Sequence, residues 1–490
     1  MLVDDKVYLG TSTRPEYLAL KFGNRHGLVT GATGTGKTVS LQIMAEGFSR
    51  AGVPVFCADV KGDLSGISMI GTPQDFLLKR AQQIGFTDYA NAAFPTIFWD
   101  LFGAKGHPVR TTISEMGPLL LSRILGLNDT QEGVLNVAFK YADDNGLLLL
   151  DLKDLRALLV AVDDNSKEIS ATYGNIATAT VGTIQRALLV LEQQGATNFF
   201  GEKALDINDL MRLAPDGRGY VSVLAADQLM QSPQLYATFL LWLMSELFEV
   251  LPEVGDPVKP RLVFFFDEAH LLFDGAPKAL VDKVEQVVKL IRSKGVGIYF
   301  VTQNPIDIPE SVLAQLGNRV QHALRAYTPR EQQAVKVAAD TFRPNPAFST
   351  AEVITQLGTG EALVSVLEEN GIPSMVGRTF IRPPSSRLGP ITPGERQAIM
   401  AQSPVGAIYD TLIDRQSAYE VLKGRQAQPA PAPGAPATPA APRPSNRESL
   451  GEAAMKSFTR AMASSAGRQI INAVGRELVR GVLGNLLRSR

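Results

Sequence analysis

The chain has 490 residues, of which 45% are hydrophobic and 20% are charged, and its formal net charge is −1. These values are typical of a soluble globular protein with one large domain or two to three ordinary ones, and they give no support for a broadly basic surface. No uncharged apolar run reaches the length of a membrane-spanning helix, and we expect no secretory signal in residues 1–20. Because Cys57 is the single cysteine, an internal disulfide is excluded, and we expect a cytoplasmic protein in which Cys57 is an ordinary core residue.

Short apolar runs that do not alternate with polar residues recur between residues 26 and 400, after a short β-rich segment at residues 1–25. Such runs are typical of strands buried on both faces, as in a parallel sheet covered by helices. The sequence therefore predicts an α/β fold with a mainly parallel sheet. The expected strands are 26–30, 53–60, 219–226, 261–268 and 297–303, with a hairpin formed by 362–367 and 376–381.

The first of these strands leads into the sequence GATGTGKT at residues 31–38, which fits the P-loop pattern G-x-x-x-x-G-K-[ST]. Glycines let backbone N–H groups surround phosphate oxygens, and the N-terminus of the helix that follows adds partial positive charge. Lys37 supplies a charge to the β- and γ-phosphates of ATP, and Thr38 supplies a hydroxyl to Mg²⁺. The expected nucleotide-binding residues are Gly31, Thr33, Gly34, Thr35, Gly36, Lys37 and Thr38.

The second predicted strand ends in the sequence DVKGDLSG at residues 59–66. Asp59 ends the strand beside the phosphate loop, where it is either part of an ordinary Asp-Gly turn or an outer ligand of Mg²⁺. Lys61 and Gly62 belong to an exposed loop that either has no special role or contacts the nucleotide or a substrate channel. Both alternatives are open from the residues alone.

Helical periodicity dominates the next part of the chain, since apolar residues recur there every three or four positions. The clearest stripes are Leu152, Leu155, Leu159 and Val162, followed by Val181, Ile184, Leu188 and Leu191. The sequence therefore predicts a core of two parts, 26–100 and 216–400, separated by a mainly helical insertion at 101–215.

Two adjacent carboxylates, Asp267 and Glu268, follow the apolar strand in RLVFFFDEAHLLF at residues 261–273. Charges at the edge of a core are costly unless they are compensated, so the alternatives are two solvated side chains or a site for a cation and a reactive water. The phosphate loop favours the second alternative, with Asp267 positioning Mg²⁺ and Glu268 polarising the attacking water. The next strand ends at Gln303, where we expect a sensor of the γ-phosphate.

The C-terminal part begins with a helical extension at residues 401–426 and continues into a segment at 427–445 that contains seven prolines. This composition predicts a linker with a reach of roughly 60 Å if it is fully extended. Apolar residues recur at every fourth position from Ile470 to Leu486, beside basic residues. This pattern predicts a basic amphipathic helix in residues 446–490. This helix either docks on protein or contacts a membrane surface or nucleic acid.

The order of these motifs resembles that of the HerA–FtsK superfamily of ring-forming, DNA-pumping ATPases, and the likeness to its YjgR branch of HerA-like helicases covers nearly the whole chain. The resemblance implies a RecA-like P-loop core, MgATP hydrolysis, a homohexameric ring and duplex DNA as the translocated substrate. It also implies an arginine that reaches the γ-phosphate held by the neighbouring subunit. Arg292, 24 residues after Glu268, is the first candidate for this finger, and Arg319 is the second.

Two departures from the superfamily limit what the resemblance implies. Barely 30 residues precede the phosphate loop, too few for the N-terminal barrel that couples HerA proper to a nuclease, so a nuclease partner is not inferred. The membrane spans and the DNA-reading winged helix of FtsK-type pumps are not visible either. Two other functions remain as alternatives, a protein-moving ATPase related to conjugation and secretion motors and a nucleotide-switched scaffold.

Overall fold

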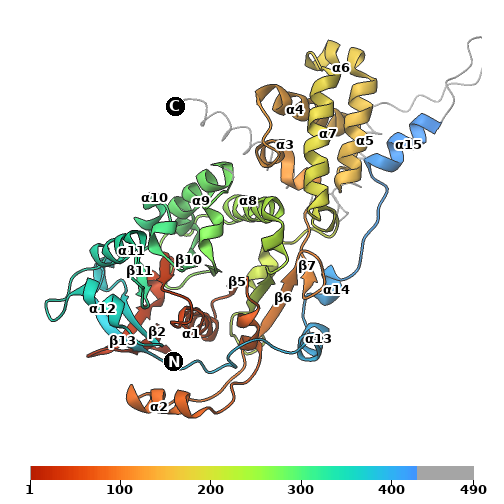
Figure 1. Cartoon of the computed structure of the whole chain (residues 1–490). Coiled ribbons are helices and arrows are strands. Elements are labelled where there is room, and N and C mark those ends of the chain that lie inside the picture. The colour runs from red at the N-terminus through yellow and green to blue at the C-terminus, as the bar shows by residue number, and fades with distance from the viewer. Residues whose placement is uncertain (1, 277, 428–490) are drawn as a thin grey trace, which may run out of the picture. The chain divides into compact units, whose positions relative to one another are not determined.

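Thirteen strands form one sheet in residues 2–276 and 278–427, the part of the chain that the computed structural model describes (Figure 1). The order across the sheet is β1-β2-β13-β12-β11-β4-β10-β9-β5-β8-β6-β7, and β3 pairs with β2 beside this path. These elements belong to one unit, residues 1–427. The predicted linker after Ala427 and the predicted amphipathic tail lie outside the described residues.

The central strands of the sheet all run in the same direction. They are, in sheet order, β11 (Asn318–Gln321), β4 (Gly27–Thr30), β10 (Val296–Thr302), β9 (Leu262–Phe266), β5 (Val55–Asp59), β8 (Val221–Ala225), β6 (Thr96–Asp100) and β7 (His107–Pro108). The prediction of a mainly parallel α/β sheet is confirmed.

Antiparallel strands extend the sheet beyond β11. They are β12 (Glu361–Ser365), β13 (Gly377–Ile381), β2 (Lys6–Thr11), β3 (Pro15–Ala19) and β1 (Leu2–Val3). The predicted hairpin is present as β12 and β13. The N-terminal β-rich segment joins the same sheet, because β2 pairs with β13.

Helices cover both faces of the parallel strands. The strand β9 alternates its side chains, so that Val263 and Phe265 pack on the face of α1 (Lys37–Arg50), whereas Phe264 and Phe266 pack on the face of α8 (Pro233–Val250) and α9 (Lys278–Leu290). All five residues of β9 are buried. Burial on both faces explains why this strand is an uninterrupted apolar run.

Five helices lie in the chain between β7 and β8, within the segment predicted as a helical insertion. They are α3 (Ile113–Ile124), α4 (Asp129–Asp144), α5 (Leu152–Asp164), α6 (Ser166–Tyr173) and α7 (Thr178–Gln193). The two predicted apolar stripes are buried in α5 and α7, and Asp151 caps α5 by accepting hydrogen bonds from the backbone N–H groups of Lys153 and Asp154. No helix in the described part of the chain is long and apolar enough to cross a membrane.

The remaining helices flank the sheet or follow its last strand. They are α2 (Asp75–Gln83), α10 (Glu310–Leu313), α11 (Pro329–Asp340), α12 (Thr350–Gln356), α13 (Pro393–Ala401), α14 (Gly406–Tyr409) and α15 (Ala418–Ala427). The last of them, α15, returns to the helical insertion and packs against α5 (Figure 1).

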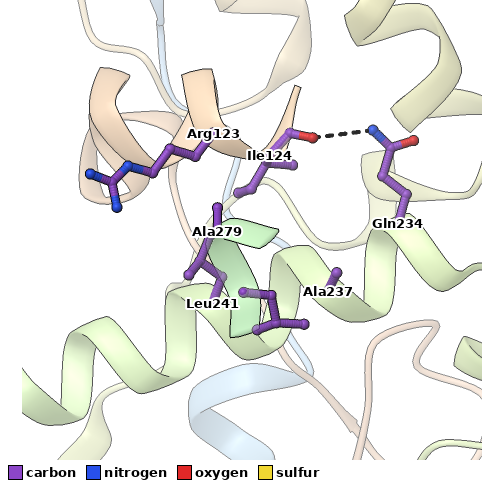
Figure 2. A pocket seen from close by; sticks show the side chains of 7 residues that line it. Arg123, Ile124, Gln234, Ala237, Leu241 and Ala279 are labelled. Carbon is purple, nitrogen blue, oxygen red and sulfur yellow. Dashed lines mark hydrogen bonds between the residues drawn. The ribbon is translucent and has the colours of Figure 1, made fainter. Parts of the chain in front are cut away.

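A small apolar cavity marks the joint between the helical insertion and the core (Figure 2). The side chains of Ile124 from α3 and of Ala237 and Leu241 from α8 line it, and Gln234 Nε2 donates a hydrogen bond of 3.3 Å to the Ile124 carbonyl. In Figure 2 the guanidinium of Arg123 points away from Gln234. This lining is suited to packing one helix end on another rather than to binding a phosphate.

Candidate functional site

The register of the parallel strands brings the predicted site residues to one edge of the sheet. Thr302 of β10 lies beside Thr30 of β4, and Phe300 of β10 lies beside Phe266 of β9. Phe266 in turn lies beside Ala58 of β5. The loops that leave the carboxyl ends of these four strands are therefore neighbours, and this edge is where ligands bind in open α/β sheets.

The phosphate loop leaves β4 and turns into α1 through glycines in the left-handed region. Gly31, Gly34 and Gly36 have φ values of 150°, 80° and 117°, which favour glycine. No protein atom lies within 4 Å of where a Cβ on Gly34 would be, so the tip of the loop is open to a ligand. Thr35 closes the turn by donating a hydrogen bond of 2.7 Å from Oγ1 to the Ala32 carbonyl.

Lys37 is the first residue of α1, and its ammonium group points back into the phosphate loop. Its Nζ donates hydrogen bonds of 2.6 Å and 3.1 Å to the carbonyls of Gly31 and Ala32. Burial lowers the pKa of Lys37, and the nearby Glu268 carboxylate opposes this effect. Thr38, the second residue of the helix, is half-buried beside it.

His322 has a structural role and supports the phosphate loop from behind. The backbone N–H of His322 donates to the Thr30 carbonyl, and its Nε2 lies 2.8 Å from Ser40 Oγ of α1. A Cβ on Gly31 would lie 2.5 Å from the His322 Cβ, so only glycine fits there. Burial lowers the pKa of His322 to about 4, which keeps the ring neutral beside Lys37.

The two predicted carboxylates leave the end of β9 and are both buried. Asp267 Oδ1 accepts a hydrogen bond of 2.9 Å from the Glu268 N–H. Burial, followed by the charge of Glu268, raises the pKa of Asp267 to about 6. A buried carboxylate whose pKa is raised in this way gains from a nearby cation, which is the expected environment of a Mg²⁺ ligand.

Glu268 is held by side chains from two neighbouring loops, and His270 of its own loop lies nearby. Lys61 Nζ pairs with Glu268 Oε1, while Gln303 Nε2 donates a hydrogen bond of 3.2 Å to Oε2 and His270 Nδ1 lies 3.4 Å from Oε2. Burial alone would raise the pKa of Glu268, but the hydrogen bonds from Lys61 and Gln303 outweigh it and lower the pKa. Gln303 also contacts the phosphate loop, since Thr33 Oγ1 lies 3.4 Å from its Oε1.

In the turn after β5, Asp59 and Lys61 have different contacts, which bear on the roles that their sequence left open. Asp59 accepts hydrogen bonds from the backbone N–H groups of Gly62 and Leu64, at 2.8 Å and 3.1 Å, so its carboxylate orders the turn. Burial, followed by the charge of Asp267, raises the pKa of Asp59 to about 7. Lys61, in contrast, reaches the general-base candidate Glu268, a pairing that the sequence pattern did not identify.

The two finger candidates lie apart from this cluster. Arg292 belongs to the short helix η7 (Ile291–Lys294) before β10, at the opposite edge of the sheet, and its Nη2 pairs with Asp256 at 2.9 Å. Arg319 lies within β11, where its guanidinium donates hydrogen bonds to the carbonyls of Leu313 and Leu316. Because Arg319 satisfies the carbonyl of the last residue of α10 and one in the turn that follows, its contacts are those of a structural residue.

The chemistry of the site fits a nucleoside triphosphate and a divalent cation. A buried ammonium group that is held only by the carbonyls of its own loop can instead bind phosphate oxygens, and the loop around it is open at Gly34. On the other side of the site, Thr38 and Asp267 offer the oxygen ligands that Mg²⁺ prefers. Glu268 and Gln303 are hydrogen-bonded to each other, and Gln303 also contacts Thr33 of the phosphate loop.

Comparison with known proteins agrees with this arrangement. The helicase HerA-like C-terminal family matches residues 5–490. The bacterial conjugative coupling protein TrwB is similar in structure, with a TM-score of 0.51 and 15% identity over 79% of this chain and 92% of that chain. VirB4 of Thermoanaerobacter pseudethanolicus is similar with a TM-score of 0.51 and 14% identity over 77% of this chain and 97% of that chain. At these identities the likeness shows the fold alone, and no curated protein matches the sequence.

Proposed function

Because the chain belongs to the helicase HerA-like C-terminal family, we propose that it hydrolyses ATP with Mg²⁺ and uses the energy to move duplex DNA through a ring of identical subunits. The observation that carries the catalytic part is the meeting of three strand ends. The phosphate loop after β4, the acid pair after β9 and Gln303 after β10 lie at one edge of the sheet. This is the arrangement that phosphoryl transfer to water requires.

The side chains have separate tasks in this reaction. Lys37 and the N–H groups of the phosphate loop bind the β- and γ-phosphate oxygens, and Glu268 accepts the proton of the attacking water. Gln303 contacts both Glu268 and Thr33 of the loop, and these contacts support a role for Gln303 as the sensor of the γ-phosphate. Thr38 and Asp267 would hold Mg²⁺, which supplies positive charge against the developing negative charge on the phosphate oxygens.

Duplex DNA as the substrate rests on the family rather than on a site in the structure. A motor that moves protein is the second candidate, because the fold is shared with a conjugative coupling protein and with VirB4. The deciding measurement is the steady-state ATPase rate with and without long duplex DNA. Stimulation that grows with duplex length supports a DNA motor, whereas a rate that DNA leaves unchanged supports a protein motor.

A further inference from the structure

Both carboxylate oxygens of the general base are occupied in the structure. Glu268 Oε1 pairs with Lys61 Nζ, and Oε2 accepts the hydrogen bond from Gln303 Nε2. A general base needs an oxygen within hydrogen-bond reach of the proton that it removes. The arrangement is therefore one in which Glu268 is held by protein groups rather than placed on a water.

The backbone of Glu268 is also in an uncommon conformation. Its φ and ψ are 48° and 46°, in the left-handed region that side-chain-bearing residues rarely adopt. Such a conformation persists only where surrounding contacts hold it, and it is enriched at switch regions. The contacts that hold the side chain come from Lys61 after β5 and Gln303 after β10, on either side of β9.

The two members of the ion pair differ in their access to solvent. The side chain of Lys61 is 43% exposed, whereas that of Glu268 is 6% exposed. Lys61 lies in a loop with free space, since no atom comes within 4 Å of a Cβ placed on the adjacent Gly62. A ligand that arrives from solvent therefore meets the lysine first, and an ion pair with an exposed lysine is readily exchanged for another partner.

We propose that Lys61 is a positioning residue that restrains Glu268 while no substrate is engaged, and that a DNA phosphate releases Glu268 by taking Lys61 as its partner. The proposal rests on the proposed function, in which Glu268 is the base of ATP hydrolysis. This restraint keeps ATP turnover slow until DNA binds near the loop at residues 59–66. DNA stimulation of the ATPase then has a local cause, the exchange of one carboxylate partner of Lys61 for a phosphate.

The test compares single variants in the full chain by steady-state kinetics. We expect Lys61→Ala to raise kcat in the absence of DNA by at least about threefold. KM for ATP should change by less than about twofold, because the phosphate loop is unchanged. Adding duplex DNA should then produce little further increase. Lys61→Arg keeps a cation at this position and should stay as slow as the wild type without DNA.

Lys105 provides a matched control lysine. It pairs with Asp227 at 2.5 Å, it is 50% exposed, and this pair follows the ends of β6 and β8 rather than that of β9. Lys105→Ala should leave kcat without DNA unchanged. If it raises kcat as much as Lys61→Ala does, the effect is a general loosening of this edge of the sheet, and the proposal is wrong.

The remaining outcomes separate this proposal from the proposed function. A kcat of Lys61→Ala that falls or stays the same would overturn the restraint, and an unchanged response of that variant to DNA would overturn the release. The double variant Lys61→Ala/Glu268→Gln should be inactive. If it keeps the increase in kcat without DNA that Lys61→Ala shows, the restraint does not act through Glu268. Near wild-type turnover of Glu268→Gln alone would instead refute Glu268 as the base and with it the proposed function of the site.

Discussion

Glu268 is the residue on which the catalytic interpretation depends most directly. We expect Glu268→Gln to lower kcat by about 10²-fold or more, because an amide cannot take the proton of the attacking water. Affinity for a fluorescent ATP analogue should be retained, since Lys37 and the phosphate loop are unchanged. The control is Lys37→Ala, which should lose both binding and turnover, because no other side chain of the loop supplies a positive charge.

The buried carboxylate of Asp59 predicts a pH dependence of stability. Its pKa is about 7 in the folded protein, against an ordinary value of 3.8, so between these values the folded chain binds more protons than the unfolded chain. The free energy of unfolding therefore falls as pH rises from about 4 to 7. We expect Tm of the nucleotide-free protein in EDTA to fall between pH 5 and pH 8, and to fall less steeply in Asp59→Asn. Parallel curves for the two proteins would contradict this assignment.

At the residue scale, the sequence predicts the groups that are contiguous in the chain and misses those that meet through the sheet. The phosphate loop is a local pattern, and Asp267 and Glu268 follow a recognisable strand. Lys61 and His322 have no such pattern. Their contacts with Glu268 and with the phosphate loop depend on β5 lying beside β9 and on β11 lying beside β4, which is a property of strand order.

At the scale of elements, a buried ion pair fastens the segment after β13 to helix α1. Arg382 Nη1 and Glu46 Oε2 are 3.0 Å apart with both side chains fully buried, and Ser386 donates two further hydrogen bonds to Glu46. We expect Glu46→Gln to lower the free energy of unfolding by about 3–5 kcal/mol, because it leaves the Arg382 charge buried and unpaired. Chemical denaturation followed by circular dichroism measures the change.

An exposed ion pair provides the control for that experiment. Arg14 and Glu368 are 2.6 Å apart, but their side chains are 52% and 44% exposed. Glu368→Gln should therefore leave the free energy of unfolding almost unchanged. Equal effects of Glu46→Gln and Glu368→Gln would mean that burial does not set the contribution of the Glu46–Arg382 pair.

If Arg292 contacts a bound nucleotide, its position requires that it does so across a subunit interface. The strand β10, Val296–Thr302, separates Arg292 from Gln303, and seven extended residues span about 23 Å, too far for a side chain to reach the phosphate loop of its own chain. Arg292→Ala and Lys37→Ala should each be nearly inactive alone. Mixed rings should regain part of the activity. At some interfaces, the intact phosphate loop of an Arg292→Ala subunit faces the intact Arg292 of a Lys37→Ala subunit.

Subunit exchange must be shown with labelled chains for the mixing result to be decisive. If exchange occurs and no activity returns, Arg292 does not act across an interface. Arg319→Ala is a useful comparison, because the loss of its bonds to Leu313 and Leu316 should lower stability rather than turnover.

Three strands of the sheet, β6, β7 and β11, were not predicted from the sequence. The strand β7 has only two residues and lies in the segment predicted to be mainly helical. The run TIFWD of β6 is five residues long and stands just before the helical segment, where periodicity gives no signal of a strand. The run NRVQ of β11 is mostly polar, yet it pairs with β4 on one side and β12 on the other. Short strands of this kind are stabilised by their neighbours in the sheet, so local propensity does not identify them.

At the scale of the whole molecule, the last described helices connect parts of the chain that are distant in sequence. Tyr409 of α14 is fully buried. Its ring packs edge-on against that of Trp99, with ring centroids 5.3 Å apart. Its hydroxyl group donates a hydrogen bond to Asp209. Asp410 Oδ1 lies 2.7 Å from Nδ1 of the buried His107. The segment after α13 therefore packs against both the end of the sheet and the loops next to the helical insertion.

These contacts predict where the chain can be shortened. The unit formed by residues 1–427 contains every described element, so a chain that ends at Ala427 should remain soluble and melt cooperatively with a Tm close to that of the full chain. A chain that ends at Pro404 loses Tyr409 and α15. Removal of one buried aromatic side chain costs about 3–5 kcal/mol, so this shorter chain should melt at a much lower temperature or aggregate. Calorimetry of the two truncations beside the full chain makes the comparison. Aggregation of the chain that ends at Ala427 would show instead that residues 428–490 complete the core or a subunit interface.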